Sequence, residues 1–299
     1  MWMLYTLLTF SFWGIADLFY KIGNRGEEKY NHLKTGIMVG LVMGIHATIF
    51  LLSTKTKIDL IDIIKYLPVS LCYITSMVIG YKGLKYLELS ISSPIQNTSG
   101  VITALLLMII FKEKYNYSFF IAVFLIFTGI IIISLLEIKD NKQKRINYKK
   151  NNTVKKVITL TIIFPLVYCL LDGIGTFLDG LYLDKLELIG EDAALIAYEY
   201  TFAIYALITY IYLKIKKESF HIFVEKPKLA AALFETGGQI FYVKAMSGNA
   251  TISAPIVGSY CVLSMLLSRI ILKEKLTKKE YIGIFFVLIG VIILAIMDI

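Results

Sequence analysis

Apolar runs of about 20 residues alternate with short polar segments along almost the whole chain. Each run is long enough to cross the hydrocarbon core of a bilayer as an α-helix, the form in which a single segment satisfies its own backbone groups in lipid. The pattern therefore predicts an all-α membrane protein with ten transmembrane helices. The expected spans are 2–22, 34–53, 63–83, 91–111, 117–138, 156–180, 193–213, 228–246, 251–272 and 279–298.

One long polar stretch, the Lys- and Asn-rich segment 139–155, interrupts this pattern. It divides the chain into a first unit, 1–138, and a second unit, 156–299, each with five expected helices. Because five is odd, the second unit must enter the membrane from the opposite face. We therefore expect two inverted five-helix repeats related by a pseudo-two-fold axis in the membrane plane, with the working site near that axis.

An internal repeat supports this division. Residues 91–114 and 252–275 align without a gap at an offset of 161 residues, and 12 of the 24 positions are identical. Such internal repeats in an apolar chain are typical of secondary transporters. The matched positions include the pairs Ser92/Ser253 and Pro94/Pro255 and the Lys-Glu-Lys triplets at 112–114 and 273–275. Beyond these segments, Gly129 matches Gly290 at the same offset.

Composition and charge agree with a membrane location. The chain is 57% hydrophobic with a mean hydropathy of +0.71, more apolar surface than one soluble core hides. The net charge of +9 is concentrated in loops, most densely at 139–156, where it fits lipid headgroups better than nucleic acid. With the N-terminus in the cytoplasm, the inner loops would carry 7 Lys/Arg and the outer loops 24, so the positive-inside tendency favours both termini outside.

Other classes of protein lack their signatures in this sequence. The three cysteines lie in separate apolar runs without a CxxC pair, and no histidine pair has metal-ligand spacing. Walker A, G-x-S-x-G and H-E-x-x-H motifs are absent, so we expect neither an enzyme nor ATP-driven transport, and no metal or cofactor. The N-terminal apolar segment has no basic region before it and is interpreted as the first membrane helix.

Three features resemble the EamA branch of the drug/metabolite transporter (DMT) superfamily. They are the S-x-P sequence that opens spans four and nine, the Lys-Glu-Lys turn after each of these spans, and the matched glycines of spans five and ten. The resemblance covers nearly the whole chain. It implies a multi-pass secondary transporter of small metabolites in the plasma membrane of a bacterium. It also implies a cavity between the halves, lined by helices such as 1, 3, 4, 6, 8 and 9. It places both termini in the cytoplasm, whereas the Lys/Arg count of the loops favours both termini outside.

Ionisable groups inside the apolar runs are the strongest indication of a site, because each costs roughly 2.5–3.5 kcal/mol to insert at mid-helix. Four of them are the carboxylates Asp17, Asp172, Glu199 and Glu235. This surplus of carboxylates indicates an amine-bearing substrate or proton coupling. Asp172 and Glu235 are the first candidates for both roles, and Glu199 is a further candidate for the proton. Asp179, nearer a helix end, is interpreted as a helix-end or interfacial residue, and the lone His46 as a packing residue.

Aromatic and neutral polar groups accompany these acids. Trp13 precedes Asp17 by one turn, an arrangement that suits an ammonium group, although Asp17 could instead pair locally with Lys21. Glu235 begins a polar stripe that continues at i+4 and i+7. The remaining candidates for substrate binding are Tyr73, Tyr81, Gln96, Asn97, Tyr168, Gln239, Tyr242 and Tyr260.

These observations predict a secondary active transporter that moves a small polar, amine-bearing metabolite by alternating access with proton coupling. An amino acid, a choline-like compound or another organic cation would fit. The expected partners are this small molecule, a proton or other coupling ion, and the lipid bilayer, but no nucleic acid. A neutral metabolite or sugar as substrate and a non-transporting membrane scaffold remain as alternatives, and a membrane-embedded enzyme lacks a nucleophile–base pair. The sequence leaves the substrate's identity, the direction of transport and the oligomeric state open.

Overall fold

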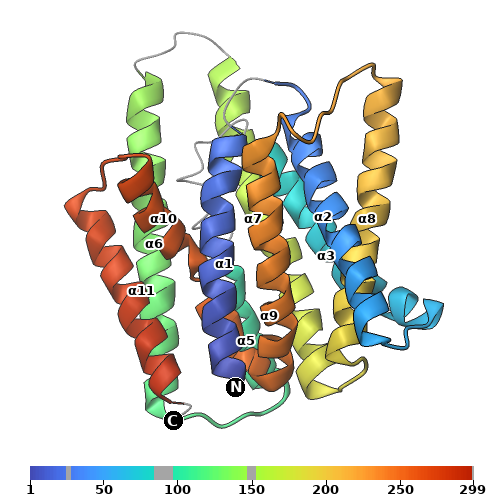
Figure 1. The fold of residues 1–299 in the computed structure, drawn as a ribbon. Coiled ribbons are helices and arrows are strands. Elements are labelled where there is room, and N and C mark those ends of the chain that lie inside the picture. The colour runs from blue at the N-terminus through green and yellow to red at the C-terminus, as the bar shows by residue number, and fades with distance from the viewer. Residues whose placement is uncertain (25–27, 84–96, 147–152, 298–299) are drawn as a thin grey trace.

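The computed structural model describes residues 1–24, 28–83, 97–146 and 153–297, without the side chains of Tyr81 and of 137–165. Within these ranges the chain is a bundle of helices with no strand (Figure 1). The helices are α1 (Trp2–Gly23), α2 (Asn31–Thr54), α3 (Leu60–Gly83), α5 (Ser99–Ile110), α6 (Tyr117–Ile146), α7 (Thr153–Asp179), the π-helix η1 (Gly180–Lys185), α8 (Glu191–Ile215), α9 (Lys226–Val257), α10 (Tyr260–Ile271) and α11 (Lys278–Ile296).

The helices have the length and surface of membrane spans. Among the described residues, seven helices are long and apolar enough to cross a bilayer, and α9 and α10, bent by 45°, pass the same test together. Large apolar side chains such as Ile49 (60% exposed) and Phe124 (66% exposed) cover the outside of the bundle, which lipid would solvate. The chain is therefore an all-helical, multi-pass membrane protein. Part of the expected fourth span, 91–96, lies outside the described residues.

In the region of the expected eighth and ninth spans, the structure differs from the prediction made from the sequence. A single helix over 251–272 is wrong, because the chain breaks between α9 and α10 at Gly258 and Ser259. Pro255 removes a backbone donor just before the break. A Cβ at Gly258 would lie 3.1 Å from the Asn97 carbonyl oxygen, so the chain approaches the start of α5 closely there.

A second break lies inside α9. Asn249 has extended backbone angles (φ −167°, ψ 89°), and its side-chain oxygen accepts a hydrogen bond from the Ile252 amide at 3.0 Å. This bond caps the segment that follows, as a helix N-cap does. The helix is thus kinked at Asn249, and α9 consists of two helical pieces.

The helices of the two halves pack against each other in reciprocal pairs. α1 packs on α9 and α3 on α7, whereas α2 packs on α8 and α6 on α11. Exchanging each of the first five expected helices with its counterpart in the last five turns the α1–α9 pair into the α3–α7 pair. The α2–α8 and α6–α11 pairs each join two counterparts and stay the same. Two glycines allow the α6–α11 contact, because a Cβ at Gly129 would lie 2.5 Å from the Gly283 carbonyl oxygen and one at Gly290 would lie 2.7 Å from that of Ala122. Both partners, like both glycines, are 161 residues apart.

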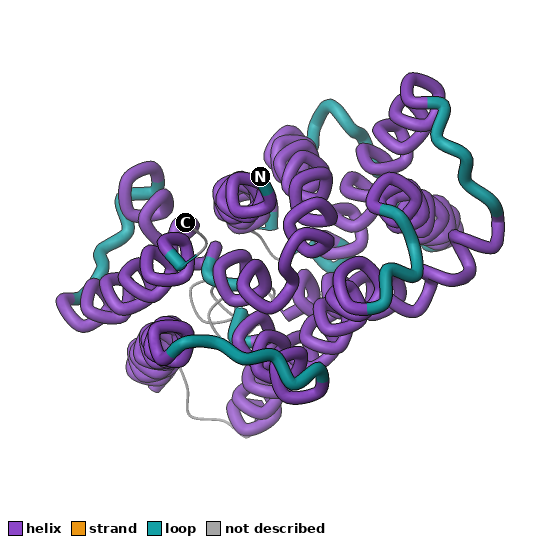
Figure 2. The backbone as a smooth tube through the Cα atoms, turned by 90° about the horizontal axis from the view of Figure 1, so that it is seen from below, coloured by secondary structure: helices purple, strands orange, loops and turns teal. Residues whose placement is uncertain are grey.

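The ends of the bundle show how the halves are oriented. The N- and C-termini lie at the same end, and the two Lys-Glu-Lys turns, between α5 and α6 and between α10 and α11, lie toward opposite ends (Figure 1). Seen from below, most helices are viewed nearly end-on (Figure 2). Each turn is tied to the other half by an ion pair, Glu113 with Lys185 and Glu274 with Lys21.

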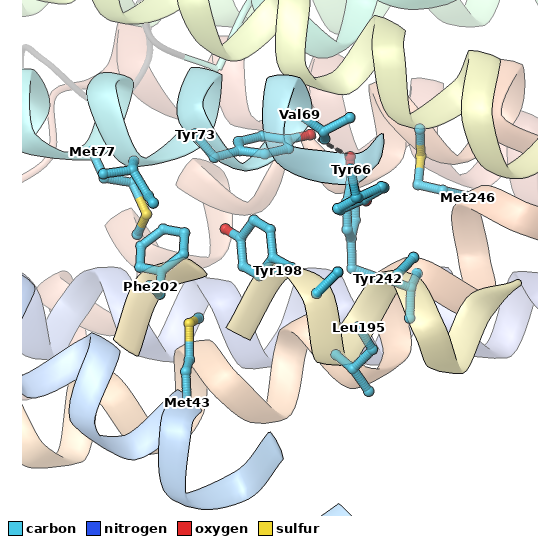
Figure 3. Close-up of a cluster of buried hydrophobic side chains, with 14 of the residues drawn as sticks. Met43, Tyr66, Val69, Tyr73, Met77, Leu195, Tyr198, Phe202, Tyr242 and Met246 are labelled. Carbon is cyan, nitrogen blue, oxygen red and sulfur yellow. Dashed lines mark hydrogen bonds between the residues drawn. The ribbon is translucent and has the colours of Figure 1, made fainter. Parts of the chain in front are cut away.

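Two buried clusters hold the bundle together. One joins α1, α2, α3, η1, α8 and α9 and includes Met43, Tyr66, Tyr73, Tyr198 and Phe202, which pack together in Figure 3. The other joins α5, α6, α10 and α11 with the last part of α9. The first cluster forms the wall behind the site described next.

Candidate functional site

A cavity of about 90 Å³ lies between the two halves of the chain. Because a cavity needs roughly 10–15 Å³ to hold one water, this one has room for several waters or for the head group of a small amine. Nine residues that the sequence singles out line it together: Trp13, Asp17, Tyr73, Asn97, Tyr168, Asp172, Glu235, Tyr242 and Tyr260. They come from α1, α3, α7, α9, α10 and the turn before α5, so the fold converges on this cavity.

Three carboxylates line the cavity, and no Lys or Arg is among its described lining residues. Asp17 comes from α1, Asp172 from α7 and Glu235 from α9. Ser99 at the start of α5 donates a hydrogen bond to Asp172 at 2.6 Å and so fixes this carboxylate against α5. A concave site walled by apolar groups and lined by acids concentrates a field that attracts cations.

Trp13 is held in one orientation by its neighbours. Its indole N–H donates to the Glu235 backbone carbonyl at 3.2 Å, and its ring packs on Tyr242 with centroids 4.8 Å apart. The ring of Tyr260 meets it edge-on at 6.0 Å. Gly238 makes this position available, because a Cβ there would lie 2.3 Å from the indole Cδ1. The three rings form an aromatic wall beside the carboxylates.

The remaining sequence candidates lie elsewhere. Gln239 is buried on α9 but is not among the lining residues, and its Nε2 has no partner in the described part of the chain. Glu199 of α8 pairs with His46 of α2 at 2.7 Å, away from the cavity. The side chain of Tyr81 and all of Gln96 lie outside the described residues. Lys21, one turn after Asp17, forms an ion pair with Glu274 of the other half.

Asp179 corrects another interpretation of the sequence. A helix-end or interfacial position was expected; Asp179 is the last residue of α7, but its side chain is fully buried, so the interfacial position is wrong. η1 continues the helical rod directly from α7, so Asp179 lies within the bundle and not at its edge. Its carboxylate accepts hydrogen bonds from Tyr66 and, at 2.8 Å, from Tyr73. The signal available in the sequence was the repeated Leu-Asp-Gly at 171–173 and 178–180, which places Asp172 and Asp179 on one helical face.

Comparison with known proteins assigns the family. The profile of the EamA-like transporter family matches residues 1–135 and 159–296, most of the chain. The chain belongs to the EamA-like transporter family. The resemblance noted in the sequence is thereby confirmed, and the protein is a membrane transporter of the DMT superfamily.

Solved structures agree at the level of the fold. The crystal structure of another protein matches with a TM-score of 0.69 over 99% of this chain and 98% of that chain, at 9% sequence identity. At that identity the match supports the fold alone. No curated protein matches the sequence.

Proposed function

We propose that this EamA-like protein is a secondary active transporter of a small amine-bearing solute, such as an amino acid, a choline-like compound or another organic cation. The observation that carries the proposal is the composition of the cavity wall. Three carboxylates and an aromatic wall converge there without a lysine or arginine among the described lining residues. Such a wall favours a positive charge and disfavours an anion.

The geometry supports a role for each group. Asp172, oriented by Ser99, and Glu235 provide opposite charge from two different helices. Trp13 adds a ring face beside Asp17, and a cation over such a face gains about 2 kcal/mol when desolvated. Tyr73, Asn97, Tyr168, Tyr242 and Tyr260 offer hydroxyl and amide groups to the polar part of the solute. Tyr81, Gln96 and Gln239 remain candidates from the sequence.

Alternating access follows from an inverted pair of units, 1–138 and 156–299, joined by the linker 139–155. The reciprocal helix pairs, the matched glycine contacts and the placement of the two Lys-Glu-Lys turns support this arrangement. The two units would rock about the cavity and expose it to each side of the plasma membrane in turn.

Proton coupling belongs to the same proposal. Buried carboxylates in a membrane are the usual proton carriers of secondary transporters. Asp172 and Glu235 line the cavity, where a proton and an ammonium group would compete for them. Glu199 is the third candidate, and its contact with His46 places it at the interface of α2 and α8.

The test is a ligand screen on purified protein by thermal shift, followed by uptake into proteoliposomes. Amines or amino acids should raise the melting temperature, and Asp172→Asn should abolish this shift and lower uptake at least tenfold. The matched control is Glu187→Gln, an exposed residue of the loop between η1 and α8, which should change neither. Stabilisation by sugars but by no amine would favour a neutral substrate, and silence with every compound would favour a scaffold.

A further inference from the structure

A second carboxylate site lies behind the cavity. Asp179 at the end of α7 is fully buried, and it does not line the cavity. Tyr66 and Tyr73 of α3 donate hydrogen bonds to its two different oxygens. Among the described residues, no lysine, arginine or histidine is hydrogen-bonded or ion-paired to it.

A chain of hydroxyl groups joins this carboxylate to the cavity. Tyr73 donates to Asp179 at 2.8 Å, and the hydroxyl groups of Tyr73 and Tyr242 lie 2.7 Å apart, as the dashed line in Figure 3 shows. A phenol has one proton to donate, so when Tyr73 gives its proton to Asp179, Tyr242 must donate to Tyr73. Tyr242 and Tyr73 both line the cavity. When Tyr73 donates to Asp179 and not to the Thr176 hydroxyl 3.1 Å away, the hydrogen bonds run in one direction, from the cavity to Asp179.

The surroundings of Asp179 fit a proton better than a metal ion. Titratable groups face it from the neighbouring helices: Tyr66, Tyr73 and Cys72 on α3, Tyr242 on α9 and Asp172 on α7 itself. Tyr198 of α8 packs on Tyr73 behind them. None of them is a cation. Hard metal ions require several oxygen lone pairs at once, whereas here the tyrosine hydroxyls point their protons at the carboxylate. No group of three or more metal-ligating side chains was found among the described residues.

We propose that Asp179, in place of Asp172, Glu235 or Glu199, is the binding site of the coupling proton, separate from the site of the amine. This rests on the proposed function, because it gives the proton a carboxylate that the substrate does not occupy. A hydronium ion in the cavity gives a proton to Tyr242 and is left as water, Tyr242 passes its own proton to Tyr73, and Tyr73 passes its own to Asp179. One proton is transferred in total, both tyrosines end neutral, and the carboxylate becomes a carboxylic acid.

Protonation would change how the helices are joined. The acid becomes a donor, so one of the two tyrosines that bind it must turn from donor to acceptor. Tyr66 and Tyr73 come from α3, Asp179 from α7 and Tyr242 from α9, so the switch acts on three helices of the cavity wall. The amine can meanwhile occupy Asp172 and Glu235.

The experiment compares driven accumulation with exchange in proteoliposomes. Asp179→Asn keeps the size of the side chain but cannot take up the proton. This variant should still exchange labelled for unlabelled amine. The accumulation of amine that a pH gradient drives should fall at least tenfold. Full accumulation by a folded Asp179→Asn protein would overturn the proposal. Wild-type protein that exchanges no amine at all would instead overturn the proposed function.

A second variant keeps the test decisive if Asp179→Asn does not fold. Tyr66→Phe removes one donor from the carboxylate and leaves the cavity lining intact. Loss of this donor disfavours the charged form, so the pH midpoint of driven accumulation should move to higher pH. Tyr205→Phe, at a tyrosine that packs on Gly36 of α2, is the matched control and should leave the midpoint in place. An unchanged midpoint in Tyr66→Phe would also overturn the proposal.

Discussion

At the scale of single residues, the position of Trp13 depends on the absence of a side chain at Gly238. A Cβ there would lie 2.3 Å from the indole Cδ1, closer than real contacts allow. Gly238→Ala should therefore displace Trp13 from the cavity wall and cost roughly 1–3 kcal/mol through overpacking. We expect a loss of at least fivefold in amine affinity, measured by titration of purified protein, together with a lower melting temperature.

The control for this substitution is Gly190→Ala, because nothing lies within 4 Å of a Cβ built at Gly190. It introduces the same methyl group away from the cavity and should preserve both affinity and melting temperature. Native affinity in Gly238→Ala would mean that the indole does not contribute to binding.

The residues of the cavity could be predicted because burying a charge in lipid is costly and therefore informative. Asp17, Asp172 and Glu235 were predicted on that ground, and the structure brings them to one cavity. Asp179 was misjudged because its burial depends on η1, and a π-helix has no signal in the apolar pattern. Gln239 lies on the predicted stripe but does not line the cavity. This could not be predicted, because the sequence does not give the rotation of α9 about its axis.

At the scale of the helices, α2 and α8 are held together by a polar pair inside an apolar interface. Glu199 is fully buried and contacts the His46 ring nitrogen at 2.7 Å. His46→Phe would leave the carboxylate without this partner, which costs about 1–3 kcal/mol or more for a charged group. The melting temperature should fall, and Glu199→Gln in the same chain should restore part of it in a double-mutant cycle.

The same pair tests the third candidate for the proton. Glu199→Gln alone should leave proton-driven accumulation in place if Glu199 only joins the two helices. Loss of accumulation at a native melting temperature would assign the coupling proton to Glu199 and remove it from Asp179.

A second polar contact joins the α5–α6 turn to the other half. Glu113 accepts hydrogen bonds from Lys185 and, at 2.7 Å, from Thr251. Partial burial raises the pKa of Glu113, but these bonds outweigh it and hold the pKa below its usual value. A lowered pKa in the folded state means that the contact stabilises the protein above the unfolded-state pKa, and that this contribution is lost as the pH falls through the folded-state value.

Glu113→Gln should therefore lower the melting temperature at neutral pH and have less effect in acid. The difference from the wild type should shrink from about pH 5 downwards, since free glutamate titrates near pH 4.3. Thermal unfolding of both proteins across this range measures it. A difference that stays constant down to pH 3 would contradict the role of the charge.

The positions of most helices could be predicted from the apolar pattern, but the breaks could not. The pattern gave 2–22 for α1 and 193–213 for α8, each within two residues of the structure at either end. The break at Gly258 was missed because it depends on the close approach of α5, a contact between segments far apart in the chain. Apolar residues continue through it, so periodicity alone predicts one helix.

At the scale of the whole molecule, the repeat in the sequence corresponds to a pattern of contacts. The offset of 161 residues that aligns the two halves also relates the Gly129–Gly283 contact to the Ala122–Gly290 contact. The sequence could supply the matched residues but not which helix packs on which. That depends on the small residues that let two backbones approach, and most of these lie outside the best-matched segment.

The same offset relates the glutamates of the two ion pairs that join the halves. Glu113 and Glu274 are the central residues of the two Lys-Glu-Lys turns, 161 residues apart, and each pairs with a lysine of the other half, Lys185 and Lys21. The two turns lie toward opposite ends of the bundle (Figure 1). If the two units rock about the cavity, the ends must open in turn, and each ion pair must separate once in every cycle.

Covalent links in place of these ion pairs test that requirement. We would introduce cysteine pairs at 21 and 274 or at 113 and 185, in a chain whose native Cys72, Cys169 and Cys261 are replaced by alanine. A bifunctional thiol reagent that a reductant removes should stop transport through either pair, and reduction should restore it. Single-cysteine chains given the same reagent are the controls. Since one link is enough to hold one end closed, full transport with either link in place would mean that the two units do not rock about the cavity.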